Sequence, residues 1–388
     1  CFALALASSM GVAFSGNLLT LFVFYEALTL STYPLVTHHG TEKARHGGRT
    51  YLGILIATSV GLLLPAIVWT WHATGTTEFT PGGIVAGNVE GPQVGLLLFL
   101  FMFGIGKAAI MPVHRWLPAA MVAPTPVSAL LHAVAVVKAG VFSVVKVVVY
   151  VFGLDLLRAE GSAGWLLFVA SFTVLSASLV AVGIALRGGN LKRLLAYSTV
   201  SQLSYIVLAA AIYAPLATAA AALHIVAHAF GKITLFFAAG SIYTAAHKTE
   251  IREMHGIGRR MPWTMGAFAV ASLSMIGLPP AGGFVSKWYM LLGAFEADQL
   301  VAVGVLVLST LLNAAYFVPI VYVAFLGREP GREEGGPHGR GHDDHPDHGE
   351  APWPIVLALS MTAALTILLF FFPELPLALA ESLAGMRR

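Results

Sequence analysis

The stretch LHIVAHAFGKITLFFAAG, residues 223–240, is apolar except for a few side chains that include His224, His228 and Lys232. These three are each four residues apart, so a helix places them on one face. The surrounding run is long and apolar enough to cross the hydrocarbon core of a membrane. The stretch therefore predicts a membrane-spanning helix that carries two imidazoles and an ammonium along one side.

The whole chain has the composition of a membrane protein. Of its 388 residues, 57% are hydrophobic and 11% are charged, and the mean hydropathy is +0.80. A soluble domain carries about 25% charged residues. Apolar runs of about twenty residues recur along the chain, as transmembrane helices require. We expect an all-α polytopic membrane protein, integral to a lipid bilayer and crossing it many times.

Charge and cysteine content exclude several classes of protein. The balance of 22 basic and 19 acidic residues, +3, gives no indication of a nucleic-acid partner. Cys1 is the only cysteine, which excludes a disulfide framework and a Cys-ligated metal cluster. No phosphate-binding loop, dinucleotide fingerprint or haem motif has the required spacing, so we predict no catalytic residue, cofactor or metal site. Because the chain begins with Cys1 inside an apolar run, we expect a truncated start.

Apolar length, glycine and proline predict about eleven spans. They are 1–14, 17–36, 49–72, 93–121, 126–152, 163–186, 191–213, 216–246, 262–296, 299–326 and 353–375. Two are too long for one straight crossing: 93–121 contains GIGKAAIMPVHRWLP and 262–296 contains SMIGLPPAGGFVSKWYM. Proline removes a helix donor and glycine loosens the backbone, so we expect both spans to break within the membrane.

The connections between these spans alternate in charge. Segments 37–49, 187–193, 247–261 and 327–350 contain the lysines and arginines, and the connections between them are mainly acidic. The positive-inside rule then places the basic connections in the cytoplasm. The broken spans lie five spans apart and run in opposite directions, which indicates two inverted five-helix repeats at 1–153 and 163–326. The remainder, 351–388, is predicted to hold a C-terminal transmembrane helix.

Segment 327–350 is the only long polar tract. Its glycine, proline and charge content favours a mobile cytoplasmic loop that has no core. Its histidines suit a metal ion as well as a solvated linker, and they are His338, His342, His345 and His348.

Five charged residues are predicted at membrane depth, on separate spans. They are Glu26, Lys107, Lys138, Lys232 and Lys287. Each costs roughly 2.5–3.5 kcal/mol to insert, so each needs a partner or a task. A structural role is the alternative for any one of them, or for a histidine among them. Together with the histidines they favour a proton relay, because burial brings lysine toward neutrality and histidine titrates near neutral pH.

Five stretches carry a resemblance to a known family. They are NLLTLFVFYEALTLSTYPLV, KAAIMPVHRWLPAAMVAPTPVSALLHAVAVVKAGV, NLKRLLAYSTVSQLSYI, HAFGKITLFFAAGS and GLPPAGGFVSKWYML. The chain resembles the proton-conducting antiporter-like subunits shared by respiratory complex I, Mrp-type cation/proton antiporters (subunits A and D) and membrane-bound hydrogenases. That family typically has fourteen core helices, so the resemblance implies that the first three are absent here. The acidic residue usual after WLP is replaced by Ala119 and Ala120.

The resemblance implies a lateral relay of ionisable side chains. Its members are Glu26, Lys107, His132, Lys138, His224, His228, Lys232 and Lys287. Glu26 and Lys107 would form an ion pair that acts as the switch. Protons would enter from the cytoplasm near Lys232 and leave by Lys287 or a neighbouring subunit. His114 and Arg115 suit either proton guidance or a helix end.

Several functions remain open at this stage. The first is translocation of protons, possibly with coupled sodium, as a subunit of a multisubunit Mrp-type, hydrogenase-type or complex I-type assembly. A stand-alone secondary transporter is an alternative, and so is a membrane coupling subunit of another system such as inorganic-carbon uptake. Other membrane subunits are the expected partners, and a prokaryotic inner membrane is the expected location. Whether the assembly is an enzyme, such as a proton-pumping oxidoreductase, is undecided.

Overall fold

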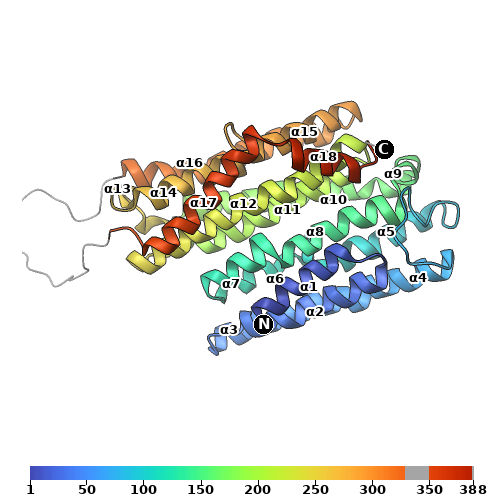
Figure 1. Cartoon of the computed structure of the whole chain (residues 1–388), viewed down its shortest axis with the longest axis horizontal. Coiled ribbons are helices and arrows are strands. Elements are labelled where there is room, and N and C mark those ends of the chain that lie inside the picture. Colours follow the sequence, from blue (N-terminus) through green and yellow to red (C-terminus); the bar gives the residue numbers. More distant parts are fainter. Residues whose placement is uncertain (328–348, 387–388) are drawn as a thin grey trace, which may run out of the picture.

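The protein is a bundle of helices whose axes share one direction (Figure 1). A computed structural model describes residues 1–327 and 349–386. Within these ranges the backbone is helical apart from turns, loops and two isolated β-bridges, Asn17–Glu78 and Asn190–Glu250. The expectation of an all-α membrane fold is confirmed. The predicted histidine-rich tract, with His338, His342, His345 and His348, lies outside the described residues apart from its ends.

The helices occupy the segments that the apolar runs predicted. The thirteen long ones are α1 (Phe2–Phe14), α2 (Leu18–Val36), α3 (Glu42–Thr58), α4 (Leu64–Thr74), α5 (Pro92–Gly104), α8 (Val136–Val147), α10 (Trp165–Leu186), α11 (Leu191–Ala210), α12 (Pro215–Ala246), α14 (Pro262–Ile276), α15 (Gly282–Glu296), α16 (Leu300–Leu326) and α17 (Trp353–Phe371). The short ones are α6 (Trp116–Ala119), α7 (Thr125–Ala129), α9 (Leu154–Ala159), α13 (Ile257–Arg260) and α18 (Glu374–Leu383). In the described residues seven helical segments are long and apolar enough to cross a membrane, and α1, α5 and α14 are shorter apolar helices. The count of eleven crossings stays a prediction.

Two segments are longer than their predicted spans because π-helical turns join their parts. Ser59–Leu63 continues α3 into α4, and Leu130–Val134 continues α7 toward α8. The first joined helix also begins earlier than the predicted residue 49, since Thr41 caps it by accepting a hydrogen bond from the amide of Ala44 at 3.1 Å. Periodicity alone gives no signal for a π-turn, which inserts one extra residue into the helix.

Both predicted helix breaks are present. The helix α5 ends at Gly104, a short 3₁₀ turn spans Gly106–Ala108, and Ala109 adopts a left-handed φ of 56°. The helix α14 ends at Ile276, Gly277 adopts φ 92°, and α15 begins at Gly282. Each break leaves backbone groups without their intrahelical partners in the middle of the bundle, so other groups must satisfy them.

The chain crosses the bundle in sequence order (Figure 1). Helices α1–α4 form one edge, α5–α8 follow, α10–α12 lie in the middle, and α13–α16 form the other edge. The middle is the most enclosed part: 83% of the apolar window in Thr125–Phe152 is buried and 61% of that in Pro215–Ala246, against 22% in Trp353–Phe371. Any chemistry that needs shelter from lipid is therefore placed on α8 and α12.

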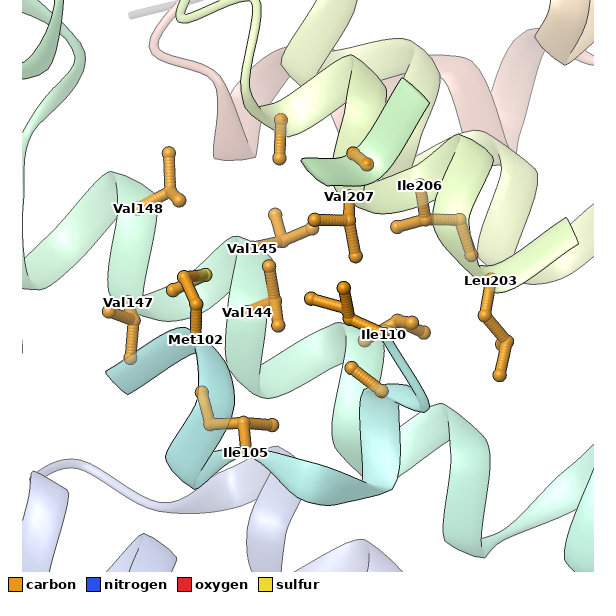
Figure 2. Packing of buried hydrophobic residues seen from close by; sticks show 14 of the residues in the cluster. Met102, Ile105, Ile110, Val144, Val145, Val147, Val148, Leu203, Ile206 and Val207 are labelled. Carbon is orange, nitrogen blue, oxygen red and sulfur yellow. The ribbon is translucent and has the colours of Figure 1, made fainter. Parts of the chain in front are cut away.

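The first break is fixed against α8 and α11 by apolar packing. Figure 2 shows Met102, Ile105 and Ile110 from the broken segment facing valines of α8 and the turn after it, with Leu203, Ile206 and Val207 of α11 beside them. Gly140 on α8 brings the backbones still closer, because a Cβ there would lie 2.5 Å from the amide nitrogen of Ala108. Only a glycine permits this approach, and it holds Lys107 against the middle of the bundle.

Two matching local motifs mark the two halves of the chain. Asn17 caps α2 and forms a bridge with Glu78, while Asn190 caps α11 and forms a bridge with Glu250. In each case two long helices separate the bridged residues, and a broken helix follows. The spacing and order agree with the two repeats that the sequence indicates.

Candidate functional site

Lys107 is fully buried at the first helix break, against α2. Its Nζ donates to the carbonyl oxygen of Tyr25 at 2.7 Å and to Oγ1 of Thr29 at 2.6 Å. The same Nζ lies 3.1 Å from the centroid of the Tyr25 ring. The ammonium is thus surrounded by an aromatic face and two oxygens, which together replace the water that burial removes.

Glu26 does not pair with Lys107 in this structure. Both carboxylate oxygens of Glu26 are buried, and neither has a hydrogen-bond partner among the described residues. The expected ion pair is absent because Lys107 emerges from the break toward Tyr25 and Thr29 instead. A buried carboxylate without a partner is costly, so this side chain needs a proton, a water or an ammonium beside it.

Lys138 and His228 join the two halves of the chain. Lys138 lies on α8 and its Nζ is 2.5 Å from Nδ1 of His228 on α12. His228 Nε2 is buried and has no hydrogen-bond partner in the described part of the chain. The contact links residues that are 90 positions apart and fixes the two most enclosed helices to one another.

His224 extends this contact toward the second helix break. Its ring centroid lies 6.3 Å from that of His228, one turn away on α12. Its Nδ1 is 2.8 Å from Oγ of Ser286, and its Nε2 is 3.1 Å from Oε1 of Gln202. Gln202 fixes the tautomer: its Oε1 is an acceptor, so Nε2 carries the hydrogen and Nδ1 accepts from Ser286.

Lys287 lies at the end of the half-helix α14. Its Nζ donates to the carbonyl oxygens of Met275 at 2.7 Å and Ile276 at 3.1 Å. These carbonyls are free of intrahelical donors because α14 ends at Ile276. The C-terminal end of a helix carries partial negative charge, so the break supplies the neutral partners that a buried ammonium needs.

A second branch connects Lys232 to the same place. Lys232 Nζ donates to Oγ of Ser198 at 2.8 Å, and that Oγ is 3.1 Å from the hydroxyl of Tyr316. The Tyr316 hydroxyl is 2.6 Å from Oδ1 of Asn313, whose Nδ2 donates to the Met275 carbonyl at 3.3 Å. Gln202 Nε2 donates to that carbonyl as well, at 3.1 Å. The branches from Lys138 and Lys232 therefore meet where Lys287 is bound.

His132 lies within a π-helical turn and has a different environment. Both of its ring nitrogens are buried, and the described residues provide no hydrogen-bond partner for either. Its nearest aromatic neighbour is Phe236, at 5.1 Å between centroids. Phe236 also lines a cavity of about 1210 Å³ with Lys43, Lys192 and Lys248 on its walls. One phenyl ring thus separates His132 from a cavity at the basic end of the bundle.

Several of these residues were missed by reasoning from sequence. Gln202, Asn313, Tyr316 and Ser198 are neutral polar residues, which are common in membrane helices, so nothing marks them out. Lys146 carries a signal that was overlooked, since it lies inside an apolar run eight residues after Lys138. Its Nζ is 2.5 Å from the carbonyl oxygen of Ser15 and 4.4 Å from the centroid of the Phe79 ring.

Two further candidates stay outside the network. Nδ1 of His114 is buried without a hydrogen-bond partner in the described residues, and its ring lies 6.2 Å from that of Tyr197. No hydrogen bond of the described residues joins His114 or Arg115 to the lysines. Those residues also contain no group of three or more His, Cys, Asp and Glu side chains placed for a metal ion.

Residues 15–313 match the family model described as NADH:quinone oxidoreductase/Mrp antiporter, transmembrane. The chain belongs to this family. It is 36% identical over 328 residues to NADH-quinone oxidoreductase subunit N of Desulforudis audaxviator, covering 84% of this chain and 64% of that protein. It is 28% identical to an Na(+)/H(+) antiporter subunit of Alkalihalophilus pseudofirmus, covering 85% and 66%. With Hydrogenase-4 component B of Escherichia coli the identity is 32%, over 77% of this chain and 45% of that protein.

Solved structures share the fold. The Mrp complex from Dietzia contains a chain with a TM-score of 0.85 and 24% identity, which covers 98% of this chain and 76% of its own length. The membrane-bound sulfane sulfur reductase, an archaeal respiratory membrane complex, contains a chain with a TM-score of 0.80 and 24% identity, over 99% of this chain and 74% of that one. The chain spans 34–66% of the length of the first three curated relatives. The expected family and the multi-pass membrane fold are confirmed.

Proposed function

We propose that this chain translocates protons across the membrane as an antiporter-like subunit of a multisubunit membrane complex. The observation that carries the proposal is the contact between Lys138 Nζ and His228 Nδ1 at 2.5 Å, which joins the two halves of the chain in its most enclosed region. An amine and an imidazole at this distance can share one proton. The relatives' names, which include antiporter, hydrogenase and quinone oxidoreductase subunits, support the same activity.

The path begins at the basic end of the bundle and ends at the second break. Protons enter through the cavity behind Phe236 and reach His132 and Lys232. They cross between the halves at Lys138 and His228, and His224 passes them toward Lys287. Gln202, Asn313 and the Met275 carbonyl hold this geometry, while hydroxyls and water carry the proton across the remaining gaps.

The Glu26–Lys107 pair is the proposed switch. In this structure Lys107 is bound to Tyr25 and Thr29, and the Glu26 carboxylate has no hydrogen-bond partner among the described residues. Bringing the two charges to 4 Å at an effective dielectric near 20 gains about 4 kcal/mol. Moving one charge against 100 mV takes about 2.3 kcal/mol. Closing and opening this pair is therefore large enough to drive one proton step.

The energy must come from outside the chain, since the sequence contains no redox motif. We infer that neighbouring membrane subunits supply it and that the two halves, 1–153 and 163–326, act as inverted repeats with one half-channel each. The matching Asn17–Glu78 and Asn190–Glu250 bridges support this division. The basic connections would face the cytoplasm of a prokaryotic cell.

Substitution of Lys138 tests the proposal in the intact complex. Lys138→Gln removes the amine, and Lys138→Arg keeps a positive charge that does not release its proton. Both variants are expected to lower proton-coupled activity at least tenfold in reconstituted vesicles while the complex assembles normally. Full activity of the arginine variant would show that only the charge matters and would refute the relay. Measuring sodium uptake in the same vesicles determines whether sodium is coupled.

A further inference from the structure

A second, smaller cavity lies on the outer side of the bundle, away from the lysine network. It has a volume of about 310 Å³ and is formed where the ends of α10 and α16 meet the segment before α13. Its polar side chains are Arg187, Arg252 and His255, and its walls include Leu186, Pro319 and Val323. It shares no lining residue with the larger cavity.

The floor of this cavity is a fixed backbone framework. The amide of Arg252 donates to the carbonyl of Gly188 at 3.2 Å, and the amide of Ile251 donates to that of Gly189 at 2.9 Å. The amide of Gly256 donates to the carbonyl of Val323 at 3.0 Å. Gly188 adopts φ +62°, and a Cβ there would lie 2.8 Å from the Cβ of Arg252. The close approach places the two arginines beside one another.

The two guanidinium groups have no counter-ion in the described part of the chain. Neither the Arg187 nor the Arg252 side chain makes a hydrogen bond or ion pair there. The nearest carboxylates are engaged elsewhere: Glu253 accepts from the amides of Thr249 and Glu250, and Glu250 accepts from Nδ2 of Asn190. No carboxylate of the described residues lines the cavity. Two adjacent arginines without an acid attract an anion, and planar guanidiniums suit phosphate oxygens.

The neighbouring surface is apolar and faces outward from the bundle. Leu186 is 78% exposed, and Tyr322 and Leu326 on α16 are 60% and 64% exposed. These side chains continue from the cavity along the outer faces of α10 and α16, where acyl chains lie in a membrane. The cavity is also at the basic end of the bundle, where the positive-inside rule places the cytoplasmic leaflet.

We propose that this cavity binds the headgroup of an anionic phospholipid from the cytoplasmic leaflet. Arg187 and Arg252 hold the phosphate, His255 lies beside it, and the acyl chains pack on Leu186, Pro319 and Val323. The lipid ties α10 to α16 at their ends and needs no proton transfer for its binding. The inference therefore stands independently of the proposed function.

The test uses the purified complex in nanodiscs that contain phosphatidylcholine with or without phosphatidylglycerol. A photoreactive phosphatidylglycerol is crosslinked, and the labelled peptides of this chain are identified by mass spectrometry. We expect labelling within 184–188 and 319–326 that falls about 30-fold in the Arg187→Gln/Arg252→Gln variant. The matched control Arg45→Gln, an exposed arginine at the same end of the bundle, keeps the wild-type labelling.

Four results would overturn the proposal. They are equal labelling of the double variant, equal labelling by a photoreactive phosphatidylcholine, loss of labelling when inorganic phosphate is added at millimolar concentration, and a crosslink from position 187 to segment 328–348 in place of lipid. The third result would identify a soluble phosphate as the ligand, and the fourth would identify the chain's own carboxylates.

Discussion

Replacing Gly140 with alanine tests whether the first helix break must lie directly against α8. The new Cβ would be 2.5 Å from the amide nitrogen of Ala108 and 2.7 Å from the carbonyl oxygen of Lys107. Ordinary contact begins at 3.4 Å, so the two backbones must separate by about 0.9 Å. Both contacting groups belong to the backbone, which cannot rotate away as a side chain can.

The cost can be separated from helix propensity by a matched control. Gly266 is also inside a helix, and a Cβ there meets no atom within 4 Å. Alanine at either position gains the same helix propensity of about 1 kcal/mol. Overpacking costs typically about 1–3 kcal/mol, so Gly140→Ala should be less stable than Gly266→Ala by about that amount. Thermal unfolding of the two purified variants in one detergent measures the difference.

Function should respond more strongly than stability. Lys107 Nζ is 2.6 Å from Thr29 Oγ1 and 2.7 Å from the Tyr25 carbonyl. A displacement of about 0.9 Å equals the difference between such a contact and a lost hydrogen bond. Proton-coupled activity of the complex should therefore fall several-fold in Gly140→Ala and stay at the wild-type level in Gly266→Ala. Identical stability and activity in the two variants would refute the reasoning.

The remaining predictions concern the second break and its ends. Lys287→Met removes the ammonium that binds the carbonyls of Met275 and Ile276, so proton-coupled activity should fall at least tenfold with the complex still assembled, and activity above half of wild type would contradict the assignment. Glu350→Gln weakens the cap of α14, where the carboxylate accepts from the amides of Trp263 at 2.6 Å and Thr264 at 3.2 Å. We expect a loss of about 1 kcal/mol in unfolding measurements with transport unchanged, and a transport defect would show that the cap has a further role.

The fold was largely predictable because its main signals are local. Apolar length located the spans, and Gly277 with the prolines after it located the second break, since both depend on nearest neighbours along the chain. The π-turn at Leu130–Val134 and the amphipathic helix α18 were not predicted. The first depends on packing between helices, and the second lies after the last apolar run, where hydropathy gives no strong signal.

The site was predictable in its members but not in its connections. The depth of Lys138, Lys232 and Lys287 followed from the apolar runs around them, and all three are buried. The predicted pairing of Glu26 with Lys107 is not formed, because the direction of a lysine after a helix break depends on dihedral angles that composition does not specify. Their functional roles stay predictions until the variants are measured.

The lysines and the helix breaks depend on one another. An intact helix satisfies its own carbonyls, so a buried ammonium beside it finds few acceptors. Ending α14 at Ile276 exposes the carbonyls of Met275 and Ile276, and Lys287 on α15 is placed to donate to both. The Met275 carbonyl also receives Gln202 and Asn313, so a movement of this half-helix changes all three contacts at once. A break of this kind therefore couples the position of a helix end to the proton affinity of a distant network, which a continuous helix cannot do.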